Sequence, residues 1–402
     1  YMPSLSVSSV WPERGVSEGG SMVTVHGSGF SAVSEGLGYL QCRFNGSVVR
    51  AQLMSEAAVV CNSTEAVAGH VSLEVSGNGR DFTSSGVRYE FVSVLVSEVT
   101  PWTGPEQGGT VVTLAGVGFV DVGLRCRFGS MELVGASMSS GSEVVCVSPV
   151  AAQTGWVGVE LVSDGESLRS GGSFFVHSRM WVSAVLPLLG PVEGGTRLTV
   201  LGSHFRESPT LACRFGRGSG ATVAARYIDA HQVECASPVQ AGASARSVEV
   251  SVNGQQFTAQ GVAYTYAAAA SVSSVWPVQG SAEGGTPVTV HGSGFTASSE
   301  ALGYLQCRLN GTVVRAQLLS GGEAMVCSSV AGWAGYVSVE VSTNGADFTS
   351  DGLQYESVWS VVSGLAPWSG PQSGGTLVAV SGTGLVSSLS LIHISEPTRP
   401  SV

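Results

Sequence analysis

One turn–strand–turn pattern recurs five times in the 402-residue chain and constrains its fold more than any other feature. Its clearest copy spans residues 283–295 (EGGTPVTVHGSGF), and four related copies begin at Glu18, Gln107, Glu193 and Ser373. The paired glycines favour a turn with positive φ, and the alternating apolar and polar residues favour a half-buried strand. A period of about 90 residues indicates a tandem array of small domains.

The rest of each repeat also consists of short segments that alternate apolar and polar residues. In the first repeat these segments are residues 22–25, 40–44, 71–75 and 87–91. The Asn78-Gly79 dipeptide predicts a type I′ hairpin turn, because both of its central residues must take positive φ. We found no long window with helical periodicity. The sequence therefore predicts an all-β fold of tandem sandwiches, each the size of a small immunoglobulin-like domain.

The repeats define the domain boundaries and two periods. We expect complete domains at residues 1–92, 93–178, 179–267 and 268–357, and a partial fifth domain at 358–388. No Gly/Ser-rich or Pro-rich linker separates them, which favours a semi-rigid rod. Trp11-Pro12 returns as Trp276-Pro277 after about 265 residues, so the larger unit is three domains, duplicated.

Residues 389–402 do not follow the pattern. The segment LSLIHISEPTR resembles the translated read-through of an adaptor used in sequencing libraries, and it interrupts the fifth repeat where a cysteine-bearing strand should follow. We therefore treat it as a non-native tail and exclude it from reasoning about the fold.

The eight cysteines fall two to each complete repeat. An even number at regular spacing in strand-rich domains indicates disulfides and an oxidising compartment, and each would stabilise its domain by about 3 kcal/mol. A metal site would need clustered ligands such as C-x-x-C, which the sequence lacks. The expected pairs are Cys42/Cys61, Cys126/Cys146, Cys213/Cys235 and Cys307/Cys327.

Composition excludes several classes of partner. The net charge of −11 argues against nucleic acid. No apolar run approaches the ~20 residues needed to cross a bilayer, so we expect no membrane insertion within this stretch. The sequence starts without methionine or a signal peptide and is treated as a fragment. Only 12% of residues are charged, so we expect glycans or burial in an assembly to complement the polar surface.

The third repeat carries a set of motifs in a fixed order. They are Pro-x-x-Gly-Gly-Thr to Gly-x-x-Phe, then Cys-Arg-Phe-Gly, Cys-x-Ser-Pro, Asn-Gly-x-x-Phe and Tyr-x-Tyr, at residues 191–205, 213–216, 235–238, 253–257 and 264–266. This order resembles IPT/TIG domains, and the resemblance covers about residues 5–388. It implies an immunoglobulin-like β-sandwich, as in plexin-like and growth-factor-receptor-like ectodomains, Rel-type transcription factors and some polysaccharide enzymes. The paired cysteines resemble the extracellular branch.

Repeats one and four depart from the Cys-Arg-Phe-Gly motif in a way that creates glycosylation sequons. Asn45 and Asn310 occupy equivalent positions, and Asn62 begins a third sequon. N-glycosylation requires an exposed Asn-x-Ser/Thr in a secreted protein. We expect these three asparagines to carry glycans, although sequons also arise by chance and by shared ancestry.

Other motifs have simpler structural explanations. Gly27-x-Gly29 and Gly292-x-Gly294 match a relaxed dinucleotide fingerprint but lack the βαβ unit that it requires, so no cofactor is expected. No catalytic set recurs, and no enzyme activity is expected. The glutamates before the paired glycines, Glu18, Glu193 and Glu283, are expected in solvated turns, with a junctional cation as the alternative. The tryptophans at the starts of domains, Trp11, Trp102, Trp276 and Trp368, are expected to pack against the preceding domain, with carbohydrate stacking as the alternative.

These observations favour a non-enzymatic, structural glycoprotein located outside the cell, either secreted or at its surface. Its tandem domains would build a filament, appendage or surface coat, and its partners would be copies of itself or other surface glycoproteins. One alternative is a spacer in an adhesion or receptor ectodomain. The other is an accessory array of a carbohydrate-active protein.

Overall fold

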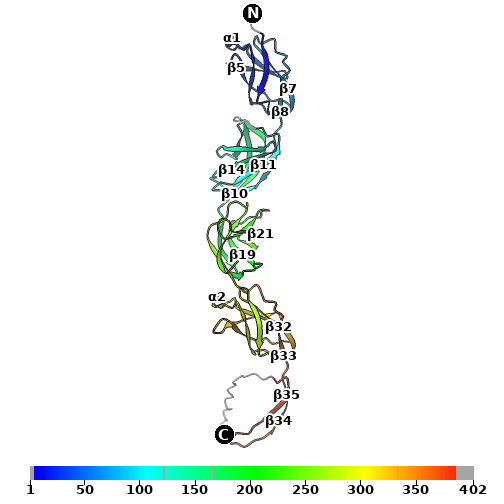
Figure 1. Ribbon diagram of the computed structural model, residues 1–402, viewed down its shortest axis with the longest axis vertical. Helices are drawn as coiled ribbons and strands as arrows, with labels where there is room; N and C mark the ends of the chain where they lie inside the picture. Colours follow the sequence, from blue (N-terminus) through cyan, green and yellow to red (C-terminus); the bar gives the residue numbers. More distant parts are fainter. Residues whose placement is uncertain (1–3, 121–122, 164–165, 333, 386–402) are drawn as a thin grey trace.

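The computed structural model describes residues 4–120, 123–163, 166–332 and 334–385. Four β-sandwiches follow one another end to end along the longest axis, from the blue N-terminal domain to the yellow and orange fourth domain (Figure 1). We call them domains 1 to 4. A fifth, partial repeat contributes one further strand pair.

Within the described residues each domain has eight or nine strands, and two short helices occur in equivalent places in domains 1 and 4. Domain 1 contains β1 (Ser6–Trp11), β2 (Arg14–Val16), β3 (Met22–Ser28), α1 (Ala32–Gly36), β4 (Gln41–Phe44), β5 (Ser47–Ser55), β6 (Ala58–Asn62), β7 (Gly69–Ser76) and β8 (Arg88–Val92). Domain 2 contains β9 (Leu95–Thr100), β10 (Thr103–Pro105), β11 (Val111–Val117), β12 (Arg125–Phe128), β13 (Val134–Ser140), β14 (Glu143–Val147), β15 (Gly155–Ser163) and β16 (Glu166–His177). Domain 3 contains β17 (Trp181–Leu186), β18 (Leu189–Pro191), β19 (Arg197–Ser203), β20 (Ala212–Phe215), β21 (Ala221–Asp229), β22 (Gln232–Ala236), β23 (Ser244–Ser251) and β24 (Val262–Ala267). Domain 4 contains β25 (Ser271–Trp276), β26 (Gln279–Ser281), β27 (Pro287–Ser293), α2 (Ala297–Ala301), β28 (Gln306–Leu309), β29 (Thr312–Arg315), β30 (Gln317–Leu318), β31 (Ala324–Ser328), β32 (Gly335–Ser342) and β33 (Gln354–Val358).

The strands form two layers, and one strand passes from one layer to the other. In domain 4 the layers are separate sheets of order β25-β27-β31-β30 and β26-β33-β32-β28-β29. In domain 1 the single strand β5 pairs first with β4 and then with β6, which joins the two layers at one edge. The chain also changes layer between β1 and β2, and β2 then runs parallel to the last strand β8. The expected all-β sandwich fold is confirmed.

A hydrophobic core fills the space between the two layers of each domain. In domain 3, Leu198 and Val200 of one layer belong to the same core cluster as Phe215 and Tyr264 of the other, and all four are almost fully buried. A disulfide crosses every core: Cys42–Cys61, Cys126–Cys146, Cys213–Cys235 and Cys307–Cys327. The cysteines lie on strands of opposite layers, so each bond fixes the separation of the layers.

A glycine that ends a second Pro-x-x-Gly segment, residues 187–190 in domain 3, allows two strands to approach closely. A Cβ on Gly190 would lie 2.1 Å from Tyr264 Oη and 2.4 Å from Thr196 Oγ1. Gly15 and Gly280 meet the equivalent tyrosines at 1.9 and 1.8 Å. Only glycine leaves room for the closing tyrosine beneath this strand, which explains why the residue recurs.

The Asn-Gly dipeptides do not all form the turn that the sequence predicted. Asn78 does not take positive φ, and the chain from β7 to β8 forms a long loop in which Asn78 Oδ1 accepts the backbone N–H groups of Arg80 and Asp81 at 2.9 and 2.8 Å. The prediction of a type I′ hairpin at this position is therefore wrong, because the Asn side chain organises the loop instead. Consecutive positive φ values occur at Asn45-Gly46, between the paired strands β4 and β5.

The fifth repeat is represented by β34 (Val361–Ala366) and β35 (Ala379–Thr383), which pair antiparallel. They correspond to β1 and β3 of domain 1. The segment interpreted as a non-native tail, residues 389–402, lies outside the described residues.

Candidate functional site at the domain junctions

The described residues hold no group of three His, Cys, Asp or Glu side chains that could bind a metal ion. Of the helices in the same part of the chain, none has the length and apolar character needed to cross a membrane. The most elaborate polar arrangements lie instead where one domain meets the next.

At the junction of domains 2 and 3, the loop that follows β23 reaches back to the end of domain 2. Asn253, which is 4% exposed, donates from Nδ2 to the Thr103 carbonyl oxygen at 3.3 Å and to Thr110 Oγ1 at 3.4 Å. Thr110 Oγ1 donates in turn to Gln256 Oε1 at 3.0 Å. Thr110 is the threonine of the recurrent Gly-Gly-Thr turn, so the motif that closes one domain binds the next.

Gln255 and Gln256 add contacts to the backbone of the same turn. The Gln255 amide accepts from the Val111 N–H and donates to the Val111 carbonyl oxygen, both at 2.8 Å. Gln256 Nε2 donates to the Gly109 carbonyl oxygen at 2.9 Å. These bonds satisfy backbone groups at the start of β11 and fix the loop against domain 2.

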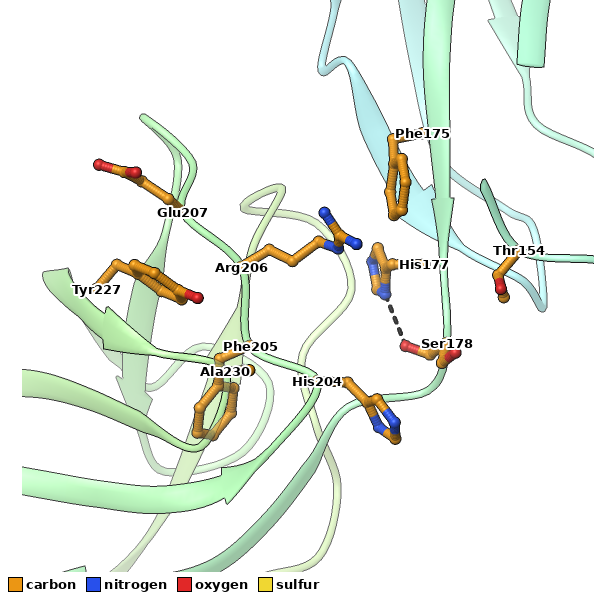
Figure 2. Close-up of a pocket in the computed structure, with 10 residues that line it drawn as sticks. All are labelled: Thr154, Phe175, His177, Ser178, His204, Phe205, Arg206, Glu207, Tyr227 and Ala230. Atoms are coloured by element: carbon orange, nitrogen blue, oxygen red, sulfur yellow. Dashed lines mark hydrogen bonds between the residues drawn. The ribbon is translucent and has the colours of Figure 1, made fainter. Parts of the chain in front are cut away.

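A cavity of about 470 Å³ lies beside this junction. Figure 2 shows Arg206 of domain 3 extending toward Phe175 and His177 of β16, and its guanidinium carbon lies 3.8 Å from the Phe175 ring centroid. Stacking of this kind stabilises a cation beside an aromatic ring. The walls are formed by Thr154, Phe175, His177, Ser178, His204, Phe205, Arg206, Glu207, Tyr227 and Ala230.

Both histidines of the cavity form a hydrogen bond with a backbone carbonyl oxygen of the segment between domains 2 and 3. Burial lowers the pKa of His177 below its usual range, while a 2.8 Å hydrogen bond between Nδ1 and the Ser178 carbonyl oxygen opposes that effect. His204 takes φ 63° at the place where Gly29, Gly118 and Gly294 stand in the other domains. A non-glycine residue in this region is strained.

The junction of domains 3 and 4 repeats the arrangement with different side chains. Thr196 of the Gly-Gly-Thr turn donates from Oγ1 to Asp347 Oδ2 at 2.5 Å, and the Leu188 N–H donates to Tyr304 Oη at 3.4 Å. Asn344, equivalent to Asn253, is 2% exposed. The same loop of the following domain therefore covers the same turn of the preceding domain at both junctions.

The junction of domains 1 and 2 includes an apolar contact. Val16, at the end of β2, is buried within the core cluster of domain 2 beside Val94 and Val96. The domain 2 loop that corresponds to Asn253 includes Asp164 and Gly165, which lie outside the described residues.

An Arg–Glu ion pair on the strands next to the junction loop recurs in domains 1, 3 and 4. Arg214 donates from Nε to Glu249 at 2.9 Å on the neighbouring strand, and its guanidinium carbon lies 4.0 Å from the Phe257 ring centroid. Domains 1 and 4 repeat the set with Arg43, Glu74 and Phe82, and with Arg308, Glu340 and Phe348. This set was not predicted, although the Arg after the first cysteine and the Phe of the Asn-Gly-x-x-Phe motif recur in all three of these domains.

The expected glycosylation sites lie on the surface. Asn45 and Asn310 are exposed at the tips of the β4–β5 and β28–β29 hairpins, with φ of 43° and 47°. Asn62 is exposed at the end of β6. Glycosylation of these residues stays a prediction.

The tryptophans at the domain starts do not pack as expected. Trp11, Trp276 and Trp368 are 69%, 54% and 92% exposed, and Trp102 stacks on Trp156 of its own domain with centroids 5.6 Å apart. The expectation that they pack against the preceding domain is wrong for Trp102 and Trp368, and Trp276 keeps more than half of its surface exposed. Trp11 belongs to the first domain of this sequence, where the expectation is not tested. They lie where the chain changes layer, and the three exposed rings point away from the core.

The comparisons with known proteins agree with this architecture. The family model described as the IPT/TIG domain matches residues 5–91, 95–177, 181–266 and 270–357. The chain belongs to the IPT/TIG domain family. The resemblance on which the sequence analysis relied is thereby confirmed.

Several curated proteins are similar in sequence to this chain. Plexin-A3 of Rattus norvegicus is 25% identical over 246 residues, which cover 58% of this chain and 13% of plexin-A3. Fibrocystin-L of Homo sapiens is 25% identical over 321 residues, which cover 75% of this chain and 7% of fibrocystin-L. The chain thus spans a small part of the length of these relatives. Among solved structures, the full extracellular region of plexin A4 aligns with a TM-score of 0.45 and 17% identity, covering 86% of this chain and 30% of that one.

Proposed function

We propose that this chain is a non-catalytic spacer in the extracellular part of a larger receptor or adhesion protein. The observation that carries the proposal is the direct hydrogen bonding of one domain end to the next at the junctions of domains 2, 3 and 4. Junctions without a linker, and with bonds to backbone groups, restrict bending between domains.

Two further observations support an extracellular location. All eight cysteines are in disulfides, which persist in oxidising compartments. The plexins among the relatives also favour a receptor context. The non-enzymatic role is part of the proposal and rests on the placement of polar groups at junctions.

Small-angle scattering by the full chain tests the stiffness. We expect an extended particle whose maximum dimension falls when Asn253→Ala and Asp347→Ala are combined, because both hydrogen-bonded junctions then loosen. Asn78→Ala is the matched control, since Asn78 occupies the same loop position in domain 1 and bonds only within its own loop. An equal change in the control variant, or no change in the combined variant, would contradict the proposal.

A second candidate function is assembly into a filament or surface coat. It is favoured by the exposed rings of Trp11 and Trp276, which recur at equivalent positions three domains apart. Such apolar groups on a weakly charged surface suit lateral contact with copies of the chain or with other surface glycoproteins. Sedimentation at increasing concentration should show association that Trp11→Ser with Trp276→Ser abolishes. A monomer at every concentration would exclude self-assembly of this chain.

A further inference from the structure

The cavity at the junction of domains 2 and 3 contains a cation without an acidic partner. Among the residues that the structure describes, no carboxylate forms an ion pair with the Arg206 guanidinium. Figure 2 shows the neighbouring Glu207 pointing away from it. Glu106, whose charge acts on His177, accepts the Arg179 N–H at 3.4 Å and is not part of the cavity walls. An uncompensated cation in a concave site favours an anionic ligand.

A buried histidine adds a hydrogen-bonding group to the same cavity. His177 is 3% exposed, and its Nδ1 donates to the Ser178 carbonyl oxygen at 2.8 Å. In the neutral imidazole the other ring nitrogen, Nε2, therefore carries a lone pair and accepts. Burial lowers the pKa of His177, which maintains this neutral form at neutral pH. Thr154 and Tyr227, which carry hydroxyl groups, also line the cavity. The walls thus offer both donors and acceptors to a ligand with hydroxyl groups.

A run of aromatic rings leads from the cavity to an exposed surface. The Arg206 guanidinium lies on Phe175, the Phe175 ring meets Trp156 edge-on, and Trp156 stacks on Trp102. Trp156 is 64% exposed. The guanidinium carbon of Arg206 and the centre of the Trp156 ring are at most about 9 Å apart, since the two separations along the run are 3.8 and 5.3 Å. An aromatic surface beside a few polar groups is typical of small-ligand sites.

These side chains are specific to the junction of domains 2 and 3. At the other two junctions, the positions of His177 and Arg206 hold residues that are neither charged nor aromatic: Val92 and Val120, and Ala267 and Thr296. His204 has a side chain at φ 63°, where the other domains have glycine, and this conformation is strained. Neither the sandwich fold nor a domain junction requires this set of residues, which indicates a role other than packing.

We propose that this cavity and the adjoining Trp156 ring bind an oligosaccharide that carries a carboxylate. The carboxylate of one sugar accepts from the Arg206 guanidinium, and a hydroxyl group of the same sugar donates to His177 Nε2. The apolar face of the next sugar stacks on Trp156, because two successive sugar rings cover the distance between Arg206 and Trp156. The site requires contact between domains 2 and 3, and otherwise does not depend on the spacer role.

The strand that forms the cavity wall offers no free edge to a peptide. Phe175 and His177 of β16 pair with Thr103 and Pro105 of β10 on one side, and Phe175 pairs with Trp156 of β15 on the other. An extended acidic peptide therefore cannot add a strand here, which is a common way for a sheet to bind a peptide. A sugar needs no strand edge, since it binds through its hydroxyl groups and its apolar ring face. The charge, the hydrogen-bonding groups and the exposed ring together favour an acidic saccharide.

Titration calorimetry of the full chain tests the proposal with three carboxylate-bearing probes, a galacturonic acid hexamer, a hyaluronan hexamer and sialyllactose. At millimolar concentration we expect at least one of them to bind. Its affinity should exceed that of the neutral probes, a glucose hexamer and lactose, by about tenfold or more, the factor that one hydrogen bond to a charged group supplies. Binding of none of the three, or equal binding of a neutral probe, would overturn the proposal. Tighter binding of a glutamate hexapeptide would identify a peptide site and would overturn it as well.

Substitutions assign the binding to the cavity. Arg206→Thr introduces the residue that domain 4 has at this position, Thr296, so the variant is compatible with the fold. It should weaken binding by about tenfold or more, and Trp156→Ala should weaken it by about threefold or more. Arg217→Thr is the matched control, because it removes the same charge from an exposed turn outside the cavity and should leave the affinity unchanged. An equal loss in the control would show nonspecific charge attraction and refute the site.

Hydrogen exchange of the unsubstituted chain locates the ligand without relying on any variant. The bound saccharide should slow exchange in residues 153–158 of domain 2 and in residues 203–208 of domain 3 together, because both segments contribute to the site. The equivalent segments of domains 1 and 4, residues 67–72 and 293–298, are the internal controls and should show no change. Protection confined to other parts of the chain would place the ligand elsewhere and contradict the assignment.

Discussion

Replacement of Gly190 by alanine should destabilise domain 3. The new Cβ would lie 2.1 Å from Tyr264 Oη and 2.4 Å from Thr196 Oγ1, and both of these side chains are fully buried. Neither group can move toward solvent, so β18 must shift from its parallel pairing with β24. Overpacking of this kind costs about 1–3 kcal/mol.

Calorimetry of the full chain can measure this effect, because tandem domains unfold as partly independent units. For a domain of this size, a loss of about 2 kcal/mol lowers the melting temperature by about 8–16 °C. Gly242→Ala is the matched control in domain 3, since nothing lies within 4 Å of its Cβ position and its φ is not positive. The control should be neutral or slightly stabilising.

A double-mutant cycle assigns the loss to the tyrosine. Tyr264→Phe removes the oxygen nearest the new methyl group, and domain 2 has a phenylalanine, Phe174, at the equivalent position. The rescue should be partial, about half of the loss, because a Cβ on Gly104 would still lie 2.7 Å from Phe174 Cζ. A loss of less than about 0.5 kcal/mol for Gly190→Ala, or additive effects in the cycle, would refute the close-approach explanation.

Three further predictions concern residues of the junctions and the hairpin tips. His204→Gly should stabilise domain 3 by about 1 kcal/mol in thermal melting, because glycine adopts φ 63° without strain. Because burial lowers the pKa of His177, the folded state binds fewer protons than the unfolded state; stability should be full above about pH 6.5 and decline as pH falls below it. Melting at pH 7.5 and pH 5 should show a smaller decline for His177→Gln, and an identical decline would disprove the assignment. When the chain is secreted by eukaryotic cells, Asn45→Gln and Asn310→Gln should each remove one N-glycan by mass spectrometry, and an unchanged mass would show that the site is unoccupied.

The repeat pattern was sufficient to predict the sandwiches, since strand alternation and the paired cysteines are local signals. It was not sufficient to place the hairpin turns. Asn45-Gly46 and Asn78-Gly79 look alike in sequence, but strands flank the first dipeptide directly, whereas no strand follows the second until Arg88. The distance to the next apolar segment, rather than the dipeptide itself, separates the two cases.

The junction contacts could not be predicted from one repeat considered alone. Gln255 and Asp347 lie in loops whose composition is typical of solvated turns, and their partners are more than 140 residues away in sequence. The prediction for the tryptophans was wrong because it relied on the general tendency of the residue type and not on its position in the fold. A large aromatic ring at a domain start favours burial in general, yet the position at which the chain changes layer directs Trp11 and Trp276 outward.

The threonine of the Gly-Gly-Thr turn makes contacts both inside its own domain and with the following domain. This explains why the position varies less among the repeats than the loop that binds it. Inside its own domain, the side chain at this position lies against the close-approach glycine, as Thr196 lies against Gly190. At the domain end, the hydroxyl of the same residue is available to the following domain, which supplies Gln256 at one junction and Asp347 at the next. A change in the loop therefore alters which domains fit together without altering the fold of the preceding domain, whereas a change at Thr196 alters both. At the two hydrogen-bonded junctions the loop residues thus differ, whereas the threonine that they bind stays the same.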